Sequence, residues 1–275
     1  MSVYYSPLRY PGGKAKIAPV LEEMLKTSGR KIYAEPFCGG AGTGLYVLMK
    51  STAEKIILND ADFGIYCFWK SILYQTDAFI ELVRNTPVTI EEWQNQRDIY
   101  ANAESAESCD ELSTGFATFY LNRTNVSGIL KAGVIGGKSQ NGKYKIDARF
   151  NRENLIKKIE KIAERKNDIT VSNLDFEDFI AEYGRDAFMY FDPPYFIRGK
   201  ELYTKYFTRK DHIRLRKSLE HANDFAVTYD NDPFIRKLYE GYAMQSFSLS
   251  YSAGTRKEGN ELMIASSEKY LLNKS

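Results

Sequence analysis

The chain has 275 residues, of which 43% are hydrophobic, and a formal net charge of +2. This size and composition predict a globular protein, with either one large core and an inserted subdomain or two modest domains. The sequence contains no apolar stretch long enough to span a bilayer and no apolar signal segment, so we expect a cytoplasmic protein without membrane contact. Three scattered cysteines and two histidines indicate neither a disulfide framework nor a metal site.

The first predicted element is a helix over residues 16–26, preceded by a turn-rich segment at residues 6–14. Apolar residues from Ile17 to Leu25 recur at helical spacing. Two glycines in the turn allow the backbone to approach a ligand closely, and Lys14 would meet a carboxylate or phosphate at the helix start. An ordinary turn before an amphipathic helix is the alternative.

A short strand over residues 31–35 leads into a glycine-rich loop at residues 36–44 and then a helix over residues 45–50. Strand, glycine loop and helix together are typical of nucleotide-binding folds, because the helix N-terminus presents unpaired amides to an anionic group. The glycine spacing matches neither the dinucleotide-binding fingerprint nor a P-loop. A different ligand that contains adenosine therefore remains open.

Two further predicted strands, over residues 55–58 and 169–171, are each followed by a carboxylate. Asp60 lies at the tip of the second strand, where a ribose diol is held in nucleotide-binding sheets. Asp175 and Phe176 form a pair suited to an adenine. The carboxylate would accept a hydrogen bond from the adenine amino group, and the ring would pack on the face of the base. For both carboxylates an ordinary helix cap is the competing interpretation.

Between residues 62 and 166 the alternation of strands and helices stops. Amphipathic helices run to residue 122, and residues 122–149 are rich in glycine, lysine, serine and asparagine. We interpret this segment either as a basic hairpin that reads a DNA groove or as a solvated loop. In the first case lysine and arginine would contact phosphates, and polar side chains such as Asn125 and Gln140 would address base edges.

An apolar strand over residues 187–191 leads into Asp192, Pro193, Pro194 and Tyr195. The C-terminal ends of strands are where α/β sheets carry their chemistry. Two successive prolines keep the backbone extended and leave its carbonyls free to accept hydrogen bonds. With the carboxylate and the aromatic ring, the loop suits a planar group with an exocyclic amine, such as adenine or cytosine, although a plain turn is the alternative.

The remaining residues predict a helix over residues 209–221, a strand over 225–228, a short helix over 232–239 and two strands over 245–251 and 262–266. The last two strands follow one another without a helix, which predicts an antiparallel hairpin at the sheet edge. Both histidines, His212 and His221, lie on the predicted helix, and we expect them to be exposed and without a role.

In chain order, five segments resemble motifs of the D12 class of adenine-specific DNA methyltransferases, the group that contains the GATC-methylating Dam enzymes. The segments are residues 7–14 (Pro-Leu-Arg-Tyr-Pro-Gly-Gly-Lys), residues 35–42 (Glu-Pro-Phe-Cys-Gly-Gly-Ala-Gly), Asn59-Asp60, Asp175-Phe176 and Asp192-Pro193-Pro194-Tyr195. The order, with the glycine loop before Asp-Pro-Pro-Tyr, is that of the α-type amino-methyltransferases.

The resemblance implies an α/β fold, with a Rossmann-like S-adenosylmethionine-dependent methyltransferase sheet whose last strand is antiparallel. It places the catalytic domain at residues 1–61 and 167–275. Residues 62–166 would be an inserted, mostly helical target-recognition domain that binds DNA and carries the basic hairpin. The implied contacts to S-adenosylmethionine are Tyr10, Lys14, Glu35, Phe37, Gly39, Gly40, Gly42, Asp60, Asp175, Phe176 and Asp192. The implied catalytic residues are Asp192, Pro193, Pro194 and Tyr195.

The residues expected to contact double-stranded DNA are Arg9, Arg123, Asn125, Ser127, Lys131, Lys138, Gln140 and Lys143. Arg9, Arg123 and the glycine at position 128 match the GATC enzymes. The chain departs from them at Val126, where they have an aromatic residue, and at Lys131, where they have an arginine that reads guanine. Because lysine does not reproduce the bidentate contact of arginine, GATC is not carried over as the target.

The expected reaction is in-line transfer of a methyl group to N6 of an adenine flipped out of duplex DNA. Asp192 and the Pro193 carbonyl would accept the two N–H groups of the amine, and Tyr195 would stack on the base. Cytosine N4 and an RNA adenine remain alternative targets. A non-catalytic DNA-binding relative remains an alternative function. Protein glutamine is disfavoured, because glutamine methylases typically carry Asn where Asp192 stands. A cognate restriction enzyme is a possible partner.

Overall fold

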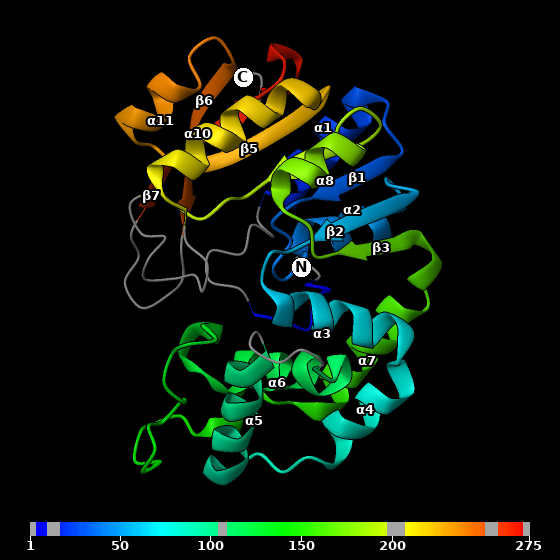
Figure 1. Cartoon of the computed structure of the whole chain (residues 1–275), viewed down its shortest axis with the longest axis vertical. Coiled ribbons are helices and arrows are strands. Elements are labelled where there is room, and N and C mark those ends of the chain that lie inside the picture. Colours follow the sequence, from blue (N-terminus) through cyan, green and yellow to red (C-terminus); the bar gives the residue numbers. More distant parts are fainter. Residues whose placement is uncertain (1–3, 10–16, 104–108, 197–206, 251–257, 272–275) are drawn as a thin grey trace. The chain divides into compact units, whose positions relative to one another are not determined.

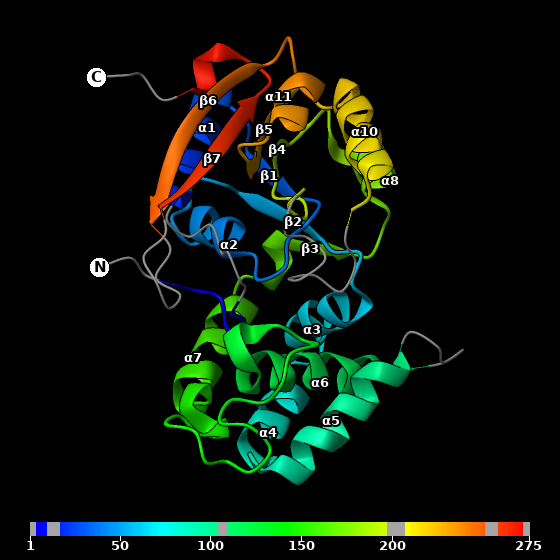
Figure 2. The same cartoon turned by 90° about the vertical axis from the view of Figure 1, so that its left-hand side faces the viewer.

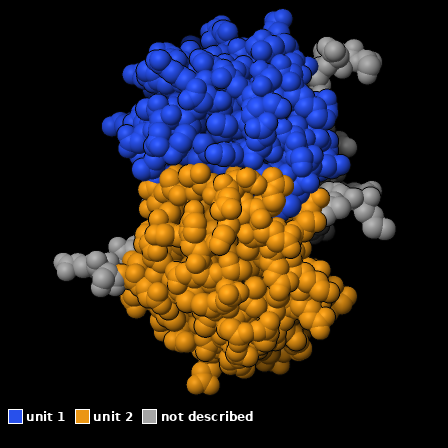
Figure 3. All heavy atoms as spheres, turned by 90° about the vertical axis from the view of Figure 1, so that its right-hand side faces the viewer, with its two compact units in different colours: residues 1–4, 14–59, 174–275 blue, residues 5–13, 60–173 orange. Residues whose placement is uncertain are grey.

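The computed structural model describes residues 4–9, 17–103, 109–196, 207–250 and 258–271 (Figure 1). The chain divides into two compact units, which Figure 3 shows in different colours. Unit 1 comprises residues 1–4, 14–59 and 174–275, and unit 2 comprises residues 5–13 and 60–173. Residues 5–13 belong to unit 2, whereas the sequence-based division places them in the catalytic domain. The assignment of DNA recognition to residues 62–166 stays a prediction.

Within the described residues, seven strands form one mixed sheet in the order β3-β2-β1-β4-β5-β7-β6. The strands are β1 (Ile32–Glu35), β2 (Lys55–Asn59), β3 (Ile169–Ser172), β4 (Phe188–Phe191), β5 (Asp224–Asp230), β6 (Ala243–Ser250) and β7 (Glu258–Ala265). β1 pairs in parallel with β2 and β4, and β4 pairs in parallel with β5. β7 is antiparallel to both β5 and β6. The predicted sheet with an antiparallel last strand is therefore confirmed, and so is the final hairpin.

Helices cover both faces of this sheet in unit 1, as Figure 2 shows. They are α1 (Ala18–Ser28), α2 (Gly42–Met49), α8 (Phe176–Tyr183), α10 (Arg209–Ser218) and α11 (Pro233–Leu238). Side chains alternate along each strand, because successive Cβ atoms point to opposite faces. Ala34, Met189 and Val227 join one buried cluster with residues of α8, α10 and α11. The residues between them, such as Tyr33 and Tyr190, point to the face that carries α1 and α2.

Unit 2 is a helical bundle with an aromatic core. Its helices are α3 (Phe63–Tyr74), α4 (Thr76–Asn85), α5 (Ile90–Ala103), α6 (Glu111–Thr124) and α7 (Arg152–Ala163). The rings of Phe68 and Phe119 are stacked, with centroids 6.0 Å apart, and Phe79 meets both rings edge-on. This packing confirms the mostly helical insertion. No helix in the described ranges is long and apolar enough to cross a bilayer.

The basic segment at residues 122–149 forms less sheet than a hairpin implies. Its described backbone contains the 3-10 helices η2 (Val126–Gly128) and η3 (Ile146–Arg149) and one antiparallel bridge, between Asn125 and Val134. Ser127 and Gln140 adopt positive φ angles of 58° and 54°, as do three of the glycines nearby. These left-handed residues turn the chain too often for a strand ladder to extend. The hairpin is therefore reduced to the single bridge.

The short 3-10 helices outside this segment are η4 (Lys166–Asp168), η5 (Leu219–His221) and η6 (Glu268–Tyr270). η5 continues α10 at the position where the sequence predicts the end of one longer helix. His212 lies on α10 and is fully buried, so the expectation that it is exposed is wrong. Its Nδ1 lies 2.8 Å from the Tyr229 hydroxyl, and burial lowers its pKa to about 4. The periodicity of one helix in the sequence could not show that an aromatic cluster packs on this face of the helix.

Candidate active site

The predicted catalytic loop follows the end of β4 directly. Phe191 pairs with Val227 of β5, so the next residues, Asp192 and Thr228, face each other at the carboxyl ends of two neighbouring parallel strands. The Thr228 hydroxyl donates a hydrogen bond of 2.9 Å to Asp192 Oδ1. Pro193 and Pro194 are buried, whereas Asp192 and Tyr195 are partly exposed. The loop therefore presents its carboxylate and its aromatic ring while its prolines are packed.

Two more hydrogen bonds anchor the end of this loop to neighbouring strands. The Tyr195 hydroxyl donates to Glu261 Oε1 of β7 over 3.3 Å, and the Phe196 amide donates to Asp230 Oδ1 of β5 over 3.2 Å. Thr228, Asp230 and Glu261 are not among the site residues predicted from the sequence. Thr228 and Asp230 carry a weak sequence signal, since they are polar residues at the end of an apolar strand. Glu261 is recognisable only once β7 is known to lie beside β5.

Glu35 ends β1 and lies beneath the glycine-rich loop. Its side chain is 3% exposed, and its Oε1 accepts hydrogen bonds from the Thr43 hydroxyl and, over 2.8 Å, from the Gly44 amide. A Cβ added at Gly44 would lie 3.3 Å from Leu58, so α2 packs closely on the sheet here. The expected cofactor contact from Glu35 stays a prediction. The carboxylate is buried and bonds to the first turn of α2, so it supports the loop that precedes this helix.

Burial raises the pKa of Glu35 to about 7. An unfolded glutamate titrates near 4.5, so the folded chain binds this proton more tightly and loses stability as the pH rises through 7. Glu35→Gln keeps the Oε1 acceptor and removes the charge. Relative to the wild type, we expect the variant's free energy of unfolding to rise by roughly 2 to 3 kcal/mol between pH 5 and pH 8. Urea denaturation at several pH values measures this difference, and parallel curves for the two proteins would contradict it.

The glycine-rich loop contains left-handed backbone. Gly39 has φ 45° and Ala41, the residue before α2, has φ 46°. α2 begins at Gly42, three residues before the predicted start, and no side chain of the residue before it caps its N-terminus. Of the first amides of α2, that of Gly44 donates to Glu35, so those of Gly42 and Thr43 are the candidates for an anionic group. Tyr10 and Lys14, which the sequence analysis assigns to the same ligand, lie outside the described residues.

Three aromatic rings gather beside this loop. The Phe37 centroid lies 5.9 Å from that of Phe176 and 5.4 Å from that of Phe207, and Phe176 and Phe207 are 5.4 Å apart. The Arg214 guanidinium lies over the Phe176 ring, 4.9 Å from its centroid. The three rings are tilted or edge-on to one another, so Phe37, Phe176 and Phe207 form an apolar cluster at the carboxyl ends of the strands.

Asp175 caps α8, as the competing interpretation predicts. Its Oδ1 accepts a hydrogen bond of 2.9 Å from the Glu177 amide. The same oxygen forms an ion pair with Arg214 Nη2 over 3.2 Å. Among the described residues, Oδ2 of Asp175 accepts no hydrogen bond. One carboxylate oxygen thus supports the helix, while the other stays available to a ligand next to the Phe176 ring.

Asn59 connects the loops that follow β1 and β3. Its Nδ2 donates to the carbonyls of Pro36 and Leu174, each over 3.1 Å, and its Oδ1 accepts from the Leu174 amide over 2.8 Å. The side chain is 1% exposed, so these bonds are made away from water. Asn59 thereby holds the loop of Phe37 close to the loop of Asp175. The sequence analysis quotes Asn59 as part of a motif but assigns it no function.

Asp60 follows the end of β2 and is partly exposed. Its Oδ1 accepts a hydrogen bond of 2.9 Å from the Asp62 amide. The N-cap of α3 is Asp62, whose carboxylate accepts from the amides of Gly64 and Ile65. The interpretation of Asp60 as a helix cap is therefore wrong, because the cap lies two residues later. The ribose contact of Asp60 stays a prediction.

Three of the predicted DNA contacts have their polar groups bound to the protein. Asn125 is 1% exposed, and its amide bonds to the Trp93 indole and to the carbonyls of residues 129 and 130. The Gln140 amide donates to the carbonyls of Ile135 and Gly137 and accepts from the amide of residue 146. The Arg123 guanidinium donates to the carbonyls of residues 149 and 7. The amides of Asn125 and Gln140 thus build the loop itself, and their expected role at base edges stays a prediction.

The other predicted DNA contacts in unit 2 are on the surface. Ser127, Lys131, Lys138 and Lys143 are exposed. Two apolar side chains of the same segment are also exposed, Val126 at 51% and Tyr144 at 59%. The segment therefore offers cationic and apolar groups to solvent together.

The backbone of Arg9 is bound to α6. The Asn122 side chain accepts from the Arg9 amide and donates to the Arg9 carbonyl, each over 2.7 Å, and also donates to the Gly128 carbonyl over 2.9 Å. Gly128 has φ 77°, and a Cβ there would collide with the Arg9 carbonyl. Asn122 thus joins the N-terminal segment to the start of the basic loop within unit 2. The Asn122 side chain is buried. Its position near the end of a helix did not predict this burial.

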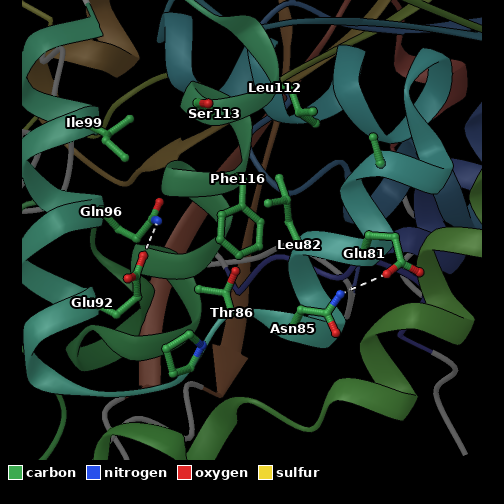
Figure 4. A pocket seen from close by; sticks show the side chains of 12 residues that line it. Glu81, Leu82, Asn85, Thr86, Glu92, Gln96, Ile99, Leu112, Ser113 and Phe116 are labelled. Atoms are coloured by element: carbon green, nitrogen blue, oxygen red, sulfur yellow. Dashed lines mark hydrogen bonds between the residues drawn. The ribbon is translucent and has the colours of Figure 1, made fainter.

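A separate pocket of about 670 Å³ lies among α4, α5 and α6 of unit 2 (Figure 4). Phe116 lines it, together with Glu81 and Glu92, which bond to Asn85 and Gln96 respectively. None of the predicted site residues lines this pocket. In the described ranges, no group of three or more His, Cys, Asp or Glu side chains is arranged to hold a metal ion.

The parallel sheet with an antiparallel β7, the glycine-rich loop after β1 and Asp-Pro-Pro-Tyr after β4 define the class of this chain as a Rossmann-like methyltransferase. The sequence model of the D12 class N6 adenine-specific DNA methyltransferase family matches residues 10–255. The chain belongs to this family and is a DNA adenine-N6 methyltransferase.

The chain is similar to the following proteins. The chain is 29% identical over 287 aligned positions to the type II methyltransferase M.MjaIII of Methanocaldococcus jannaschii, with 94% of this chain and 97% of the relative covered. It is 22% identical to the type II methyltransferase M1.LlaDCHI of Lactococcus lactis subsp. cremoris, with 90% and 89% covered. The solved structure of a candidate RNA methyltransferase from Pyrococcus horikoshii aligns with 94% of this chain and 84% of its own at 12% identity, with a TM-score of 0.44.

Proposed function

We propose that the chain methylates N6 of an adenine that is flipped out of duplex DNA, and that Asp192, Pro193 and Tyr195 hold the flipped base. The observation that carries this proposal is the anchored loop after β4. Its Asp192 carboxylate bonds to β5, and its Tyr195 hydroxyl bonds to β7. A loop fixed to two strands, β5 and β7, presents its acceptors in one arrangement, which is what aiming a lone pair requires.

The residues of unit 1 fit S-adenosylmethionine as the methyl donor. The amides of Gly42 and Thr43 at the start of α2 suit the carboxylate of its methionine portion. Phe37 and Phe176 offer ring faces to its adenine, and Asp175 Oδ2 is placed to accept from the adenine amino group. Asp60 stays the candidate for the ribose. When bound, the cofactor supplies an electrophilic methyl group on a sulfonium centre.

The protein must correct the poor nucleophilicity of the N6 amine, whose lone pair is delocalised into the purine. An ionised Asp192 only accepts hydrogen bonds, and the Pro193 carbonyl is a second acceptor. Bonds from both N–H groups to these acceptors hold the nitrogen nearer tetrahedral geometry, which localises its lone pair and orients it. The proton leaves late, to Asp192 or to solvent, so no base of low pKa is needed before attack.

Base flipping separates the target adenine from its partner before reaction, because the amine is otherwise engaged in the base pair. Tyr195 is placed to compensate for the lost stacking, which is worth roughly 1 to 3 kcal/mol for each base. Its hydroxyl is bound to Glu261, so the ring does not need to be ordered when the base arrives.

DNA recognition is proposed for unit 2, through Arg9, Ser127, Lys131, Lys138 and Lys143. The exposure of the serine and the lysines supports contacts to phosphates, which position a protein on DNA without reading sequence. Both type II relatives support the further proposal that the chain protects DNA against a restriction enzyme with the same target sequence.

The double variant Lys138→Ala, Lys143→Ala is expected to weaken binding to all duplex sequences alike. Each lost phosphate contact also reduces the slope of log K against log salt concentration by roughly 1. Fluorescence anisotropy at several salt concentrations measures this slope. Lys157→Ala is the matched control, since Lys157 is an exposed lysine of α7 that is not predicted to bind DNA. An unchanged slope in the double variant would remove both lysines from the interface.

The experiment that tests the function is transfer of labelled methyl from S-adenosylmethionine to duplex DNA of mixed sequence, followed by nucleoside analysis and methylation-sensitive sequencing. N6-methyladenine within one short motif is the expected product. N4-methylcytosine would change the substrate, and an absence of label in DNA would favour an RNA substrate or a non-catalytic DNA-binding protein.

A further inference from the structure

Two buried hydroxyls form a hydrogen-bonded chain that ends on Asp192. The hydroxyls of Tyr190 and Thr228 lie 2.9 Å apart, and the Thr228 hydroxyl donates to Asp192 Oδ1 over another 2.9 Å. Tyr190 is 3% exposed and Thr228 is fully buried. No water competes for these bonds, so each hydroxyl is held by its protein partner.

The direction of this chain follows from counting protons. A threonine hydroxyl carries one proton and donates one hydrogen bond. Because Thr228 gives its proton to Asp192, it accepts from Tyr190, and the order is Tyr190 to Thr228 to Asp192. Burial raises the pKa of the Tyr190 phenol well above its ordinary value, so this end of the chain stays a donor.

The strand register produces this arrangement. Tyr190 precedes Asp192 by two residues on β4, so both point to the same face of the sheet. Continuing the pairing of Phe191 with Val227 brings Thr228 of β5 opposite Asp192. Glu35 of β1 ends on this face as well, and its charge and that of Asp192 oppose each other's ionisation. A hydrogen bond donated to Asp192 therefore offsets the repulsion between its charge and that of Glu35.

We propose that Thr228 and Tyr190 are positioning residues for methyl transfer, which set the orientation of the Asp192 carboxylate and favour its charged form. This inference rests on the proposed role of Asp192. A hydrogen bond donated to a carboxylate stabilises the ionised state, in which the group only accepts. It also restricts rotation of the carboxylate about its bond to Cβ. The N6 amine then meets an acceptor whose direction is already set by β5.

The charged and titratable groups around this carboxylate come from three strands. Tyr33 and Glu35 of β1, Tyr190 of β4 and Tyr229 of β5 interact with Asp192 electrostatically. Asp192 therefore lies among acidic and phenolic groups, and the Thr228 hydroxyl donates directly to its Oδ1.

The test is the substitution Thr228→Val, which removes the hydroxyl while keeping a β-branched side chain of similar volume. We expect kcat to fall roughly 10- to 100-fold, the loss expected for a hydrogen bond to a charged group, with KM for S-adenosylmethionine and DNA affinity little changed. Thr228→Ser restores the donor and is expected to recover most of kcat. Tyr190→Phe removes the second link and is expected to lower kcat by less than Thr228→Val does.

Thr118→Val is the matched control, because Thr118 is a fully buried threonine in α6 whose hydroxyl bonds to the Thr114 carbonyl. It should affect stability without changing kcat of the folded enzyme. A kcat for Thr228→Val within about twofold of the wild type, or a serine variant as impaired as the valine variant, overturns the proposal. Asp192→Ala is assayed in parallel. If that variant is active, the role of Asp192 itself fails, which is distinguishable from an active Thr228→Val beside an inactive Asp192→Ala.

Discussion

Asp192→Ala is expected to reduce methyl transfer by at least roughly 10³-fold, the upper range for losing one preorganised polar group at a reacting centre. The carboxylate accepts from the N6 amine in the proposed complex, and no other residue of the Asp-Pro-Pro-Tyr motif carries a charge. DNA binding should stay nearly intact, because the cationic residues proposed to bind DNA belong to unit 2. Initial rates with labelled S-adenosylmethionine and anisotropy with duplex DNA measure the two properties separately.

Asp186→Ala is the control for this variant. Asp186 is an exposed carboxylate just before the other end of β4, so its loss changes the charge equally without reaching the loop. Wild-type turnover is expected from it. Turnover retained by Asp192→Ala would refute the role assigned to this residue and leave the Pro193 carbonyl as the remaining acceptor.

Gly115→Ala is expected to destabilise unit 2 by roughly 2 to 3 kcal/mol, the upper part of the range for overpacking a core. A Cβ at Gly115 would lie 2.6 Å from the Cys67 carbonyl oxygen and 2.8 Å from the Phe68 amide nitrogen. These are backbone atoms of α3, so they cannot move as a flexible side chain would. Alanine gains only about 1 kcal/mol of helix propensity over glycine, and the steric cost should exceed it.

Gly133→Ala provides the comparison, because a Cβ at Gly133 would meet no atom within 4 Å. Urea denaturation followed by circular dichroism should show a lower midpoint for Gly115→Ala and an unchanged one for Gly133→Ala. Equal midpoints would mean that α3 and α6 can separate without cost. The same pair of variants also shows whether DNA binding requires an intact bundle, since Gly115 lies outside the basic loop.

The parts of the site that could be read from the sequence are those that depend on local chain geometry. Asp-Pro-Pro-Tyr after an apolar run and the glycine-rich loop after a strand place their residues at strand ends whatever the rest of the chain does. The predicted helices of unit 2 were also recognisable from their periodicity. In each case the physical cause acts within about ten residues.

The polar residues of the basic loop show where such inference ends. Asn125 and Gln140 have the side chains of base-reading residues and lie among lysines, yet their amides bond to backbone carbonyls of the same loop. An irregular segment must satisfy its own backbone groups, and nearby amide side chains are the nearest partners. Which side chains remain available to DNA therefore depends on the folded path of the loop.

By itself, the sequence determined the order of the motifs and the strand that each motif follows, because these depend on local apolar runs and on the conformational limits of proline and glycine. Tertiary structure alone decided that Thr228 lies opposite Asp192 and that Glu261 holds Tyr195. Those contacts join residues that are far apart in the chain. Their existence depends on strand order and register, which are set by the packing of the whole sheet.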